Sequence, residues 1–362
     1  MAWLGGVNRE NWGELIRESL KWGRRTQKDI LKDAKSMSYK EYARRWRANF
    51  WKGRKVIYRA ATEGPTERVS MNKIKSERTG LVVTDPGEVR EEVFKGFSTE
   101  PPYKMSVPMS KEEGSDPLTD GPGLGRHFTG SGEGLGHRFV SDLFYDVLHY
   151  LPEGKAAGPD GVPNDIIKRM PKEFHDLLFR IMKKAWEGHH TPEGWKGSTV
   201  ALLHKKGDPT RLRNWRPIAL ANCTYKLYTA VVTRLMTDDA EYRSVLNGSQ
   251  EGFRRGRNTH RQLEQMILAI EDAQLSQQPL HVLYLDFENA FGSPDHDRLL
   301  EVLKYQGFAE DALAVVRDLY PGGDEETQPM MVSVRTACGE TEKFPVRRGT
   351  IQGDTLSPLL FI

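Results

Sequence analysis

Two stretches decide how this chain folds: HVLYLDFENAF at residues 281–291 and RGTIQGDTLSPLLFI at residues 348–362. The nearly all-apolar run at 280–287 is typical of a buried central strand. Asp286 lies near the end of that run, where a carboxylate is costly unless it meets a cation. Because Mg²⁺ prefers carboxylate and phosphate oxygens, Asp286 is a candidate metal ligand. The simpler alternative is an Asp that caps the next turn.

The composition is that of a polar chain. It has 362 residues, of which 38% are hydrophobic, with a mean hydropathy of -0.61 and a formal net charge of +3. No apolar run approaches the length of a membrane span, and the N-terminus lacks the layout of a secretory signal peptide. Cys223 and Cys338 are the only cysteines, so neither a disulfide framework nor a zinc site is indicated. We therefore expect a protein of the nucleus or cytoplasm that is not secreted.

Charge and composition divide the chain. Residues 1–60 carry 16 Lys and Arg but only 6 Asp and Glu, and Trp and Tyr residues are interspersed among them. This pattern suits a nucleic-acid backbone with base stacking, or alternatively a solvated helical face whose aromatic residues pack inward. Gly and Pro then cluster without any apolar period. We therefore expect a basic, mostly helical N-terminal segment at 1–99, a flexible linker at 100–137 and a globular region at 138–362.

The globular region alternates between helical and strand patterns, which predicts an α+β fold. A turn at 85–87 and the residues after it predict a helix at 88–97, ahead of the linker. In the globular region we expect helices at 140–151, 164–186, 225–236, 259–275, 294–306 and 310–319, and strands at 198–203 and 280–287. A hairpin is expected from 330–335 and 341–346 around Gly339, and another helix from Ser357.

Further short motifs precede the two opening stretches. In chain order they are GPDGVP at 158–163, HKKGDP at 204–209, NWRPIAL at 214–220, YKL at 225–227 and QEGFR at 250–254. In this order and at these separations, the set resembles the reverse transcriptase domain of non-LTR (LINE-type) retrotransposons over residues 150–362. The resemblance implies a right-hand polymerase fold of fingers and a partial palm, preceded by the basic segment and the linker.

The resemblance also implies roles for individual residues. Asp286 would be the first catalytic metal ligand, with the backbone of Phe287 beside a second metal. Phe291 would be a steric gate that leaves no room for a 2′-hydroxyl. The residues expected to bind the nucleotide are Gln352, Gly353, Lys205, Lys206 and Arg216, and those expected to bind nucleic acid are Arg254, Arg255 and Arg257.

The implied activity is that of an RNA-directed DNA polymerase that adds dNTPs to a DNA 3′-hydroxyl on an RNA template. Mg²⁺ would be the cofactor, with Mn²⁺ as an alternative. The partners would be an RNA template, a DNA primer and dNTPs, with no membrane, and the sequence leaves the oligomeric state open. The alternative interpretation is a catalytically inactive, nucleic-acid-binding remnant of such a polymerase. The amino-acid sequences of these motifs argue against another alternative, a mobile-intron maturase.

Two features depart from the family pattern. Gly292 stands where the family has an acid after the Ala-Phe pair, so we expect a weaker turn before the helix at 294–306. The family's third palm motif, an aromatic-Ala-Asp-Asp hairpin, would follow Ile362. Because two-metal catalysis needs more than one acidic ligand, we expect this chain to be a fragment with negligible polymerase activity by itself.

Overall fold

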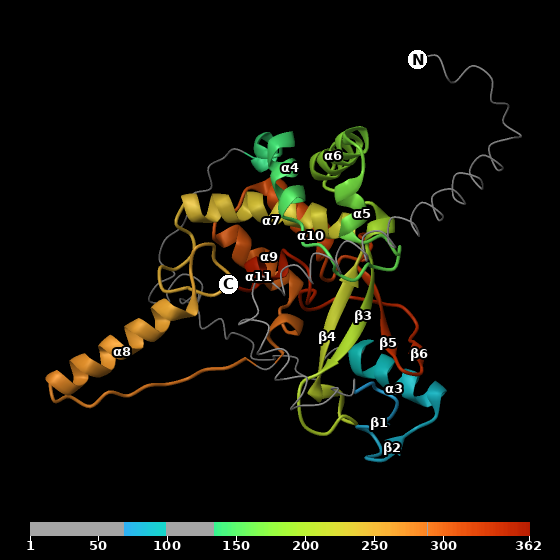
Figure 1. Cartoon of the computed structure of the whole chain (residues 1–362), viewed down its shortest axis with the longest axis horizontal. Coiled ribbons are helices and arrows are strands. Elements are labelled where there is room, and N and C mark those ends of the chain that lie inside the picture. The colour runs from blue at the N-terminus through green and yellow to red at the C-terminus, as the bar shows by residue number, and fades with distance from the viewer. Residues whose placement is uncertain (1–68, 99–133, 288) are drawn as a thin grey trace, which may run out of the picture. The chain divides into compact units, whose positions relative to one another are not determined.

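The computed structural model describes residues 69–98 and 134–362, apart from residue 288 (Figure 1). The predictions for 1–62 and for most of the linker at 100–137 lie outside the described residues. The described residues belong to one compact unit, Val69–Ile362, which mixes helices and strands. Within this part of the chain, no helix combines the length and the apolar character needed to cross a membrane.

The largest sheet has the strand order β4-β3-β5-β6, with β7 also paired to β5. Strand β3 (Gly197–His204) runs antiparallel to β4 (Trp215–Ala221), in a register from Ser198↔Ala221 to His204↔Trp215. On its other side β3 runs parallel to β5 (Met331–Thr336), which turns into β6 (Gly339–Glu340) and also pairs with β7 (Phe344–Pro345). The predicted strands at 198–203 and 330–335 are confirmed, but β7 is shorter than the predicted 341–346.

The helical core surrounds α7 (Cys223–Tyr242), whose Tyr225, Leu227, Tyr228 and Val231 are fully buried. Helices α4 and α5 pack against α7, and α10 packs against α6 and α9. The remaining helices are α4 (Ser141–Tyr150), α5 (Asn164–Arg169), α6 (Lys172–Glu187), α8 (Thr259–Leu275), α9 (His296–Tyr305), α10 (Glu310–Leu319) and α11 (Ser357–Phe361). Short 3₁₀ turns are η2 (Leu135–Arg138), η3 (Glu193–Trp195), η4 (Leu212–Asn214) and η5 (Ala290–Gly292).

The single helix predicted at 164–186 is wrong, because the structure breaks it into α5 and α6. The break falls at Met170, which has an extended backbone with ψ 152°, followed by Pro171 as the N-cap of α6. A proline has no N–H to donate and disfavours the helical conformation of the residue before it. The apolar period continues across the break, which is why the pattern alone suggested one helix.

Residues 69–98 pack on the sheet rather than standing apart from it. Strands β1 (Ile74–Lys75) and β2 (Val82–Val83) form a small hairpin. Helix α3 (Pro86–Ser98) confirms the helix predicted at 88–97. Val89 and Val93 of α3 are fully buried, and Phe94 meets Phe344 of β7 edge to face at 5.6 Å. The sequence grouped these residues with the N-terminal segment, whereas the compact unit that holds the sheet begins at Val69.

A buried ion pair joins the sheet to α10. Lys196, which directly precedes β3, is 2% exposed, and its Nζ lies 2.8 Å from Oδ1 of Asp318 near the end of α10. The same ammonium donates to the backbone carbonyls of Asp318 and Gln328, while Oδ2 of Asp318 accepts from the backbone N–H of Thr191. Such a pair is tolerated in the interior because its polar atoms are hydrogen-bonded.

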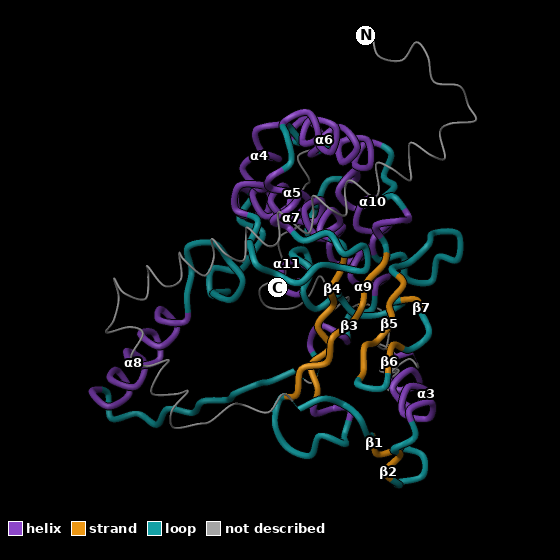
Figure 2. The backbone as a smooth tube through the Cα atoms, turned by 45° about the vertical axis from the view of Figure 1, so that its right-hand side comes forward, coloured by secondary structure: helices purple, strands orange, loops and turns teal. Residues whose placement is uncertain are grey.

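The predicted buried strand at 280–287 is also wrong. In the structure these residues form an irregular segment that returns from the far end of α8 toward the sheet (Figures 1 and 2), and Leu283, Tyr284 and Leu285 are 80–82% exposed. No strand of the described residues pairs with 280–287, so the run lacks the hydrogen-bonded neighbour that would make it a strand of a sheet.

Candidate functional site

The loop around Phe291 is tied to the segment 348–350. The backbone N–H of Thr350 donates to the carbonyl of Phe291 at 2.5 Å, and that of Gly349 donates to the carbonyl of Pro294 at 2.8 Å. The guanidinium of Arg348 also donates to the carbonyl of Ser293 at 2.9 Å. Two of the stretches that the sequence singles out, far apart in the chain, are therefore joined by their backbones.

Glycines allow this close approach. Gly349 has φ +77°, and a Cβ placed on it would lie 2.7 Å from the Cα of Gly292. The weaker turn expected at Gly292 does not follow, because α9 is capped by another residue. The side chain of Asp295 accepts from the backbone N–H groups of Asp297 and Arg298, each at 3.1 Å. The capping carboxylate is therefore present, three positions after Gly292.

Four phenylalanine rings form a row along this junction. Phe291 lies between Phe361 of α11, at 5.4 Å between ring centroids, and Phe253, at 6.0 Å and an interplanar angle of 73°. Phe361 continues the row to Phe287 at 6.1 Å. Phe287 and Phe291 were expected at the site, but Phe253 was not. The signal that could have indicated it is its position between Gly252 and the basic residues 254–257.

Gln352 and Gly353 lie against strand β4. The backbone N–H of Ala219 donates to the carbonyl of Gln352 at 2.7 Å. Gly353 has φ +109°, and a Cβ there would lie 2.8 Å from the carbonyl oxygen of Ala219. Gly353, expected to bind the nucleotide, thus has its backbone close to β4, the strand that also carries Arg216.

The next residue, Asp354, is buried in the protein and does not face solvent. Its carboxylate accepts from the hydroxyl of Thr229 at 2.5 Å, from the backbone N–H of Thr355 at 2.8 Å and from the hydroxyl of Tyr320 at 3.4 Å. Burial raises the pKa of Asp354 to about 6, although the hydrogen bonds from Thr229 and the backbone oppose the shift. This carboxylate connects the segment 352–354 to α7.

His296 holds the same junction from the start of α9. It is 1% exposed, and its Nε2 lies 2.8 Å from the carbonyl oxygen of Gly349. The backbone N–H of Gly322 donates to Nδ1 at 3.3 Å, so the neutral ring with the proton on Nε2 satisfies both contacts. Burial lowers the pKa of His296, which favours this neutral form.

Three cations expected at the nucleotide lie at the loop end of the β3–β4 hairpin. Arg216 is exposed and lies opposite Leu203 in the register of the two strands. The backbone N–H of Lys205 donates to the carbonyl of Asn214 at 2.8 Å, which closes the loop beyond β3. The side chains of Lys206 and Arg216 make no hydrogen bond or ion pair to any described residue, so both charges are available to a ligand.

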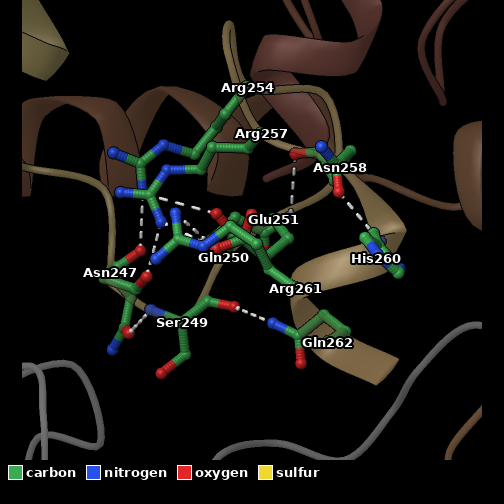
Figure 3. A network of polar contacts seen from close by, with 12 residues as sticks. Asn247, Ser249, Gln250, Glu251, Arg254, Arg257, Asn258, His260, Arg261 and Gln262 are labelled. Carbon is green, nitrogen blue, oxygen red and sulfur yellow. Dashed lines mark hydrogen bonds and ion pairs between the residues drawn. The ribbon is translucent and has the colours of Figure 1, made fainter. Parts of the chain in front are cut away.

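The three arginines expected to bind nucleic acid differ in their surroundings, and Figure 3 labels two of them, Arg254 and Arg257. Arg254 is 8% exposed and makes a bidentate pair with Glu241, with N···O distances of 2.8 and 2.5 Å. Arg257 pairs with Glu251 at 2.9 Å. The hydrogen bond to Glu241 raises the pKa of Arg254. Arg254 is therefore used inside the protein, which differs from the expectation, whereas Arg255 is exposed and makes no such contact in the described part of the chain.

Asp286 is exposed and accepts no hydrogen bond or ion pair from any described residue. Among the described residues, no group of three or more His, Cys, Asp and Glu side chains is arranged to hold a metal ion. Mg²⁺ is nevertheless often held by one or two carboxylates together with the phosphates of its substrate. The uncommitted carboxylate of Asp286 fits that kind of donor set.

Comparison with known proteins places this geometry in a family. Residues 203–362 match the family described as reverse transcriptase (RNA-dependent DNA polymerase). This part of the chain is a reverse transcriptase domain, homologous to those of non-LTR retrotransposon RNA-directed DNA polymerases. The matched region begins within β3 and contains the loop of Phe291, the segment 352–354 and the cations of the hairpin.

Individual relatives are transposon proteins. The chain is 27% identical to a probable RNA-directed DNA polymerase from transposon BS of Drosophila melanogaster, over 60% of this chain and 23% of that protein. It is 28% identical to a retrovirus-related Pol polyprotein from a type-1 retrotransposable element R2 of Popillia japonica, over 57% of this chain and 27% of that protein. It is 25% identical to the RNA-directed DNA polymerase from mobile element jockey of Drosophila melanogaster, over 60% of this chain and 23% of that protein. The chain thus spans about a quarter of the length of these curated relatives.

Proposed function

We propose that this chain supplies the fingers and part of the palm of an RNA-directed DNA polymerase, which adds dNTPs to a DNA 3′-hydroxyl on an RNA template. The observation that carries the proposal is the junction of three segments. The loop of Phe291 is bonded to 348–350, and Gln352 is bonded to β4 at Ala219. Residues expected to touch the sugar, the base and the triphosphate therefore belong to one connected piece of structure.

Asp286 is the proposed metal ligand, with the backbone of Phe287 beside it. A bound Mg²⁺, or Mn²⁺ in its place, would neutralise charge on the transferring phosphate and lower the cost of forming the alkoxide nucleophile. The protein's contribution is a carboxylate that no described residue engages. Asp286 would share the ion with the oxygens of the incoming nucleotide.

The remaining residues would bind the nucleotide and the nucleic acid and select the sugar. Lys205, Lys206 and Arg216 would neutralise the triphosphate, because an open cation at a hairpin end can meet phosphate oxygens without breaking an internal pair. Phe291 would exclude a 2′-hydroxyl by contact with the sugar. Gln352 and Gly353 would lie beside the nucleotide and template. Arg255, with Arg257 beside it, would contact the phosphates of the nucleic acid.

Primer extension tests the proposal. A protein carrying this chain is given a DNA primer on an RNA template, dNTPs and Mg²⁺, and the rate of extension is measured. Asp286→Asn should lower the rate by about 100-fold or more, since a metal ligand is worth several kcal/mol of transition-state stabilisation. Asp272→Asn is the matched control, because it removes an exposed carboxylate from α8.

The outcome for Asp286→Asn decides the assignment. Extension at the unaltered rate would show that Asp286 is not the metal ligand. If the protein instead binds RNA with a steep salt dependence, and neither extends a primer nor responds to Asp286→Asn, it acts as a nucleic-acid-binding protein.

A further inference from the structure

Phe253 has a backbone conformation that a bulky residue rarely adopts. Its φ is +59°, in the left-handed region, where a side chain with a Cβ is strained. Its ring is nevertheless 62% exposed, so burial of the ring does not explain the strain. Strain of this kind persists only where the surroundings enforce it, and it often marks a functional position.

Anchored residues on both sides of Phe253 enforce this conformation, and two of them, Glu251 and Arg254, are labelled in Figure 3. The next residue, Arg254, is anchored to Glu241 of α7, and it also donates to the carbonyl of Asn247 at 2.7 Å. Glu251, two residues before Phe253, is 7% exposed and forms ion pairs with Arg257 at 2.9 Å and with Arg261 at 3.3 Å. Both neighbours of the Gly252–Phe253 dipeptide therefore point inward, and this leaves the ring of Phe253 directed outward.

The outward ring has a specific contact. Its centroid lies 6.0 Å from that of Phe291, at an interplanar angle of 73°, which is the edge-to-face arrangement that aromatic pairs prefer. Phe291 also contacts Phe361, at 5.4 Å between ring centroids. Phe291 thus contacts two rings, one from α11 and one from the strained loop.

We propose that Phe253 is a positioning residue that holds the ring of Phe291 in place, and that selection between deoxyribose and ribose depends on this contact. The proposal rests on the proposed function, in which Phe291 contacts the sugar. A gate that discriminates by clash must resist displacement, because a ring that can swing aside admits the larger sugar. The internal ion pairs of Arg254 and Glu251 serve this purpose by fixing the loop that carries Phe253.

The test is the ratio of kcat/KM for a dNTP to that for the matching rNTP, in a protein carrying this chain. Phe253→Leu should lower this ratio by about fivefold, mainly by raising kcat/KM for the rNTP. A fivefold change corresponds to the free energy of one edge-to-face aromatic contact. Phe253→Tyr keeps the edge and should keep the ratio. Gln277→Gly is the matched control, since Gln277 is also exposed at positive φ, +53°, but lies in the turn after α8.

Phe291→Val separates this proposal from the one it rests on. If Phe291→Val lowers the ratio and Phe253→Leu does not, the positioning role is overturned while the function stands. If neither variant changes the ratio, Phe291 is not the gate, and the positioning role falls with it. In the Phe291→Val background, Phe253→Leu should have no further effect, because the two residues act as one unit.

A second measurement uses residues 1–362 alone. With 4-fluorophenylalanine at position 291, the ¹⁹F resonance should shift on Phe253→Leu, because the neighbouring ring no longer shields the label. Gln277→Gly should leave the resonance unchanged. An unchanged resonance in Phe253→Leu would show that the two rings are not in contact and would overturn the proposal.

Discussion

Asp354 illustrates, at the scale of one residue, how a buried acid can respond to pH. Its carboxylate lies among Thr229, Tyr320 and the backbone of Thr355, and burial raises its pKa to about 6 from an ordinary value of 3.8. The folded state therefore holds the proton more tightly than the unfolded state. The resulting stabilisation is fully present below pH 3.8 and is lost as the pH rises through about 6.

Asp354→Asn should remove this dependence. Relative to the variant, the wild type should lose stability between pH 4 and pH 7, by about 3 kcal/mol at most for a shift of this size. Urea denaturation at several pH values measures the difference. His296, whose pKa burial lowers, acts in the opposite direction, but it is present in both proteins and cancels. If the free energy of unfolding changed with pH equally in the two proteins, Asp354 would not be a buried carboxyl with a raised pKa.

Asp324→Asn is a control of opposite sign. The hydroxyl of Thr327 lowers the pKa of this half-buried carboxyl, so its stabilising effect is present above pH 3.8 and is lost as the pH falls. Relative to Asp324→Asn, the wild type should therefore lose stability as the pH falls, whereas relative to Asp354→Asn it should lose stability as the pH rises.

At the scale of elements, the contact between η5 and the segment 348–350 depends on backbones that almost touch. A Cβ on Gly349 would lie 2.7 Å from the Cα, 2.8 Å from the carbonyl carbon and 2.8 Å from the oxygen of Gly292. All three are backbone atoms, which cannot rotate away as a side chain can. The loop that carries Phe291 must therefore move if Gly349 is replaced.

Gly349→Ala should thus destabilise the protein by more than its positive φ alone explains. Gly80→Ala is the matched comparison, because Gly80 has φ +72° and nothing within 4 Å of its Cβ position, whereas Gly349 has φ +77°. We expect Gly349→Ala to cost about 1–3 kcal/mol more, as is usual for overpacking. Denaturant midpoints of the two variants give the difference, and equal midpoints would mean that the junction can relax.

At the scale of the whole molecule, residues 69–98 complete the sheet region. Met71, Ile74, Val89 and Val93 are all 3% exposed or less. The backbone also connects this segment to the rest, since Lys75 donates to the carbonyl of Thr210 and Ala337 donates to that of Met71. Arg90 adds a hydrogen bond to the carbonyl of Cys338 at 2.6 Å. These residues are part of the same core as the reverse transcriptase domain.

Two shortened proteins test this view. A chain beginning at Val69 keeps these contacts, whereas a chain beginning at residue 99 exposes the apolar surface beneath α3. The second should be less stable by several kcal/mol, because each buried aliphatic side chain contributes about 1.5–3 kcal/mol. Thermal unfolding of the two proteins under one set of conditions measures this. Identical transitions would show that the domain folds without residues 69–98.

Much of the fold and part of the site could be predicted from the sequence. The helix patterns of α7, α8 and α10, the strands β3 and β5 and the order of the short motifs depend on residues close together in the chain. Local propensity and spacing determine such features. The motifs of 150–362 were enough to indicate a reverse transcriptase domain, and the family match over 203–362 supports that prediction. The end of α5 before Met170 could also have been predicted, because Pro171 disfavours a helical conformation at the residue before it.

Only the tertiary structure decided which residues meet across long separations. Thr229 and Asp354 are 125 positions apart, and no periodicity links Phe253 to Phe291 or Arg254 to Glu241. The apolar run 280–287 shows the same limit, because its composition permits a strand, but a strand also needs a hydrogen-bonded neighbour and no described strand pairs with this run. Composition and spacing fix what a segment can become, whereas hydrogen-bond pairing and packing between distant segments decide what it does become.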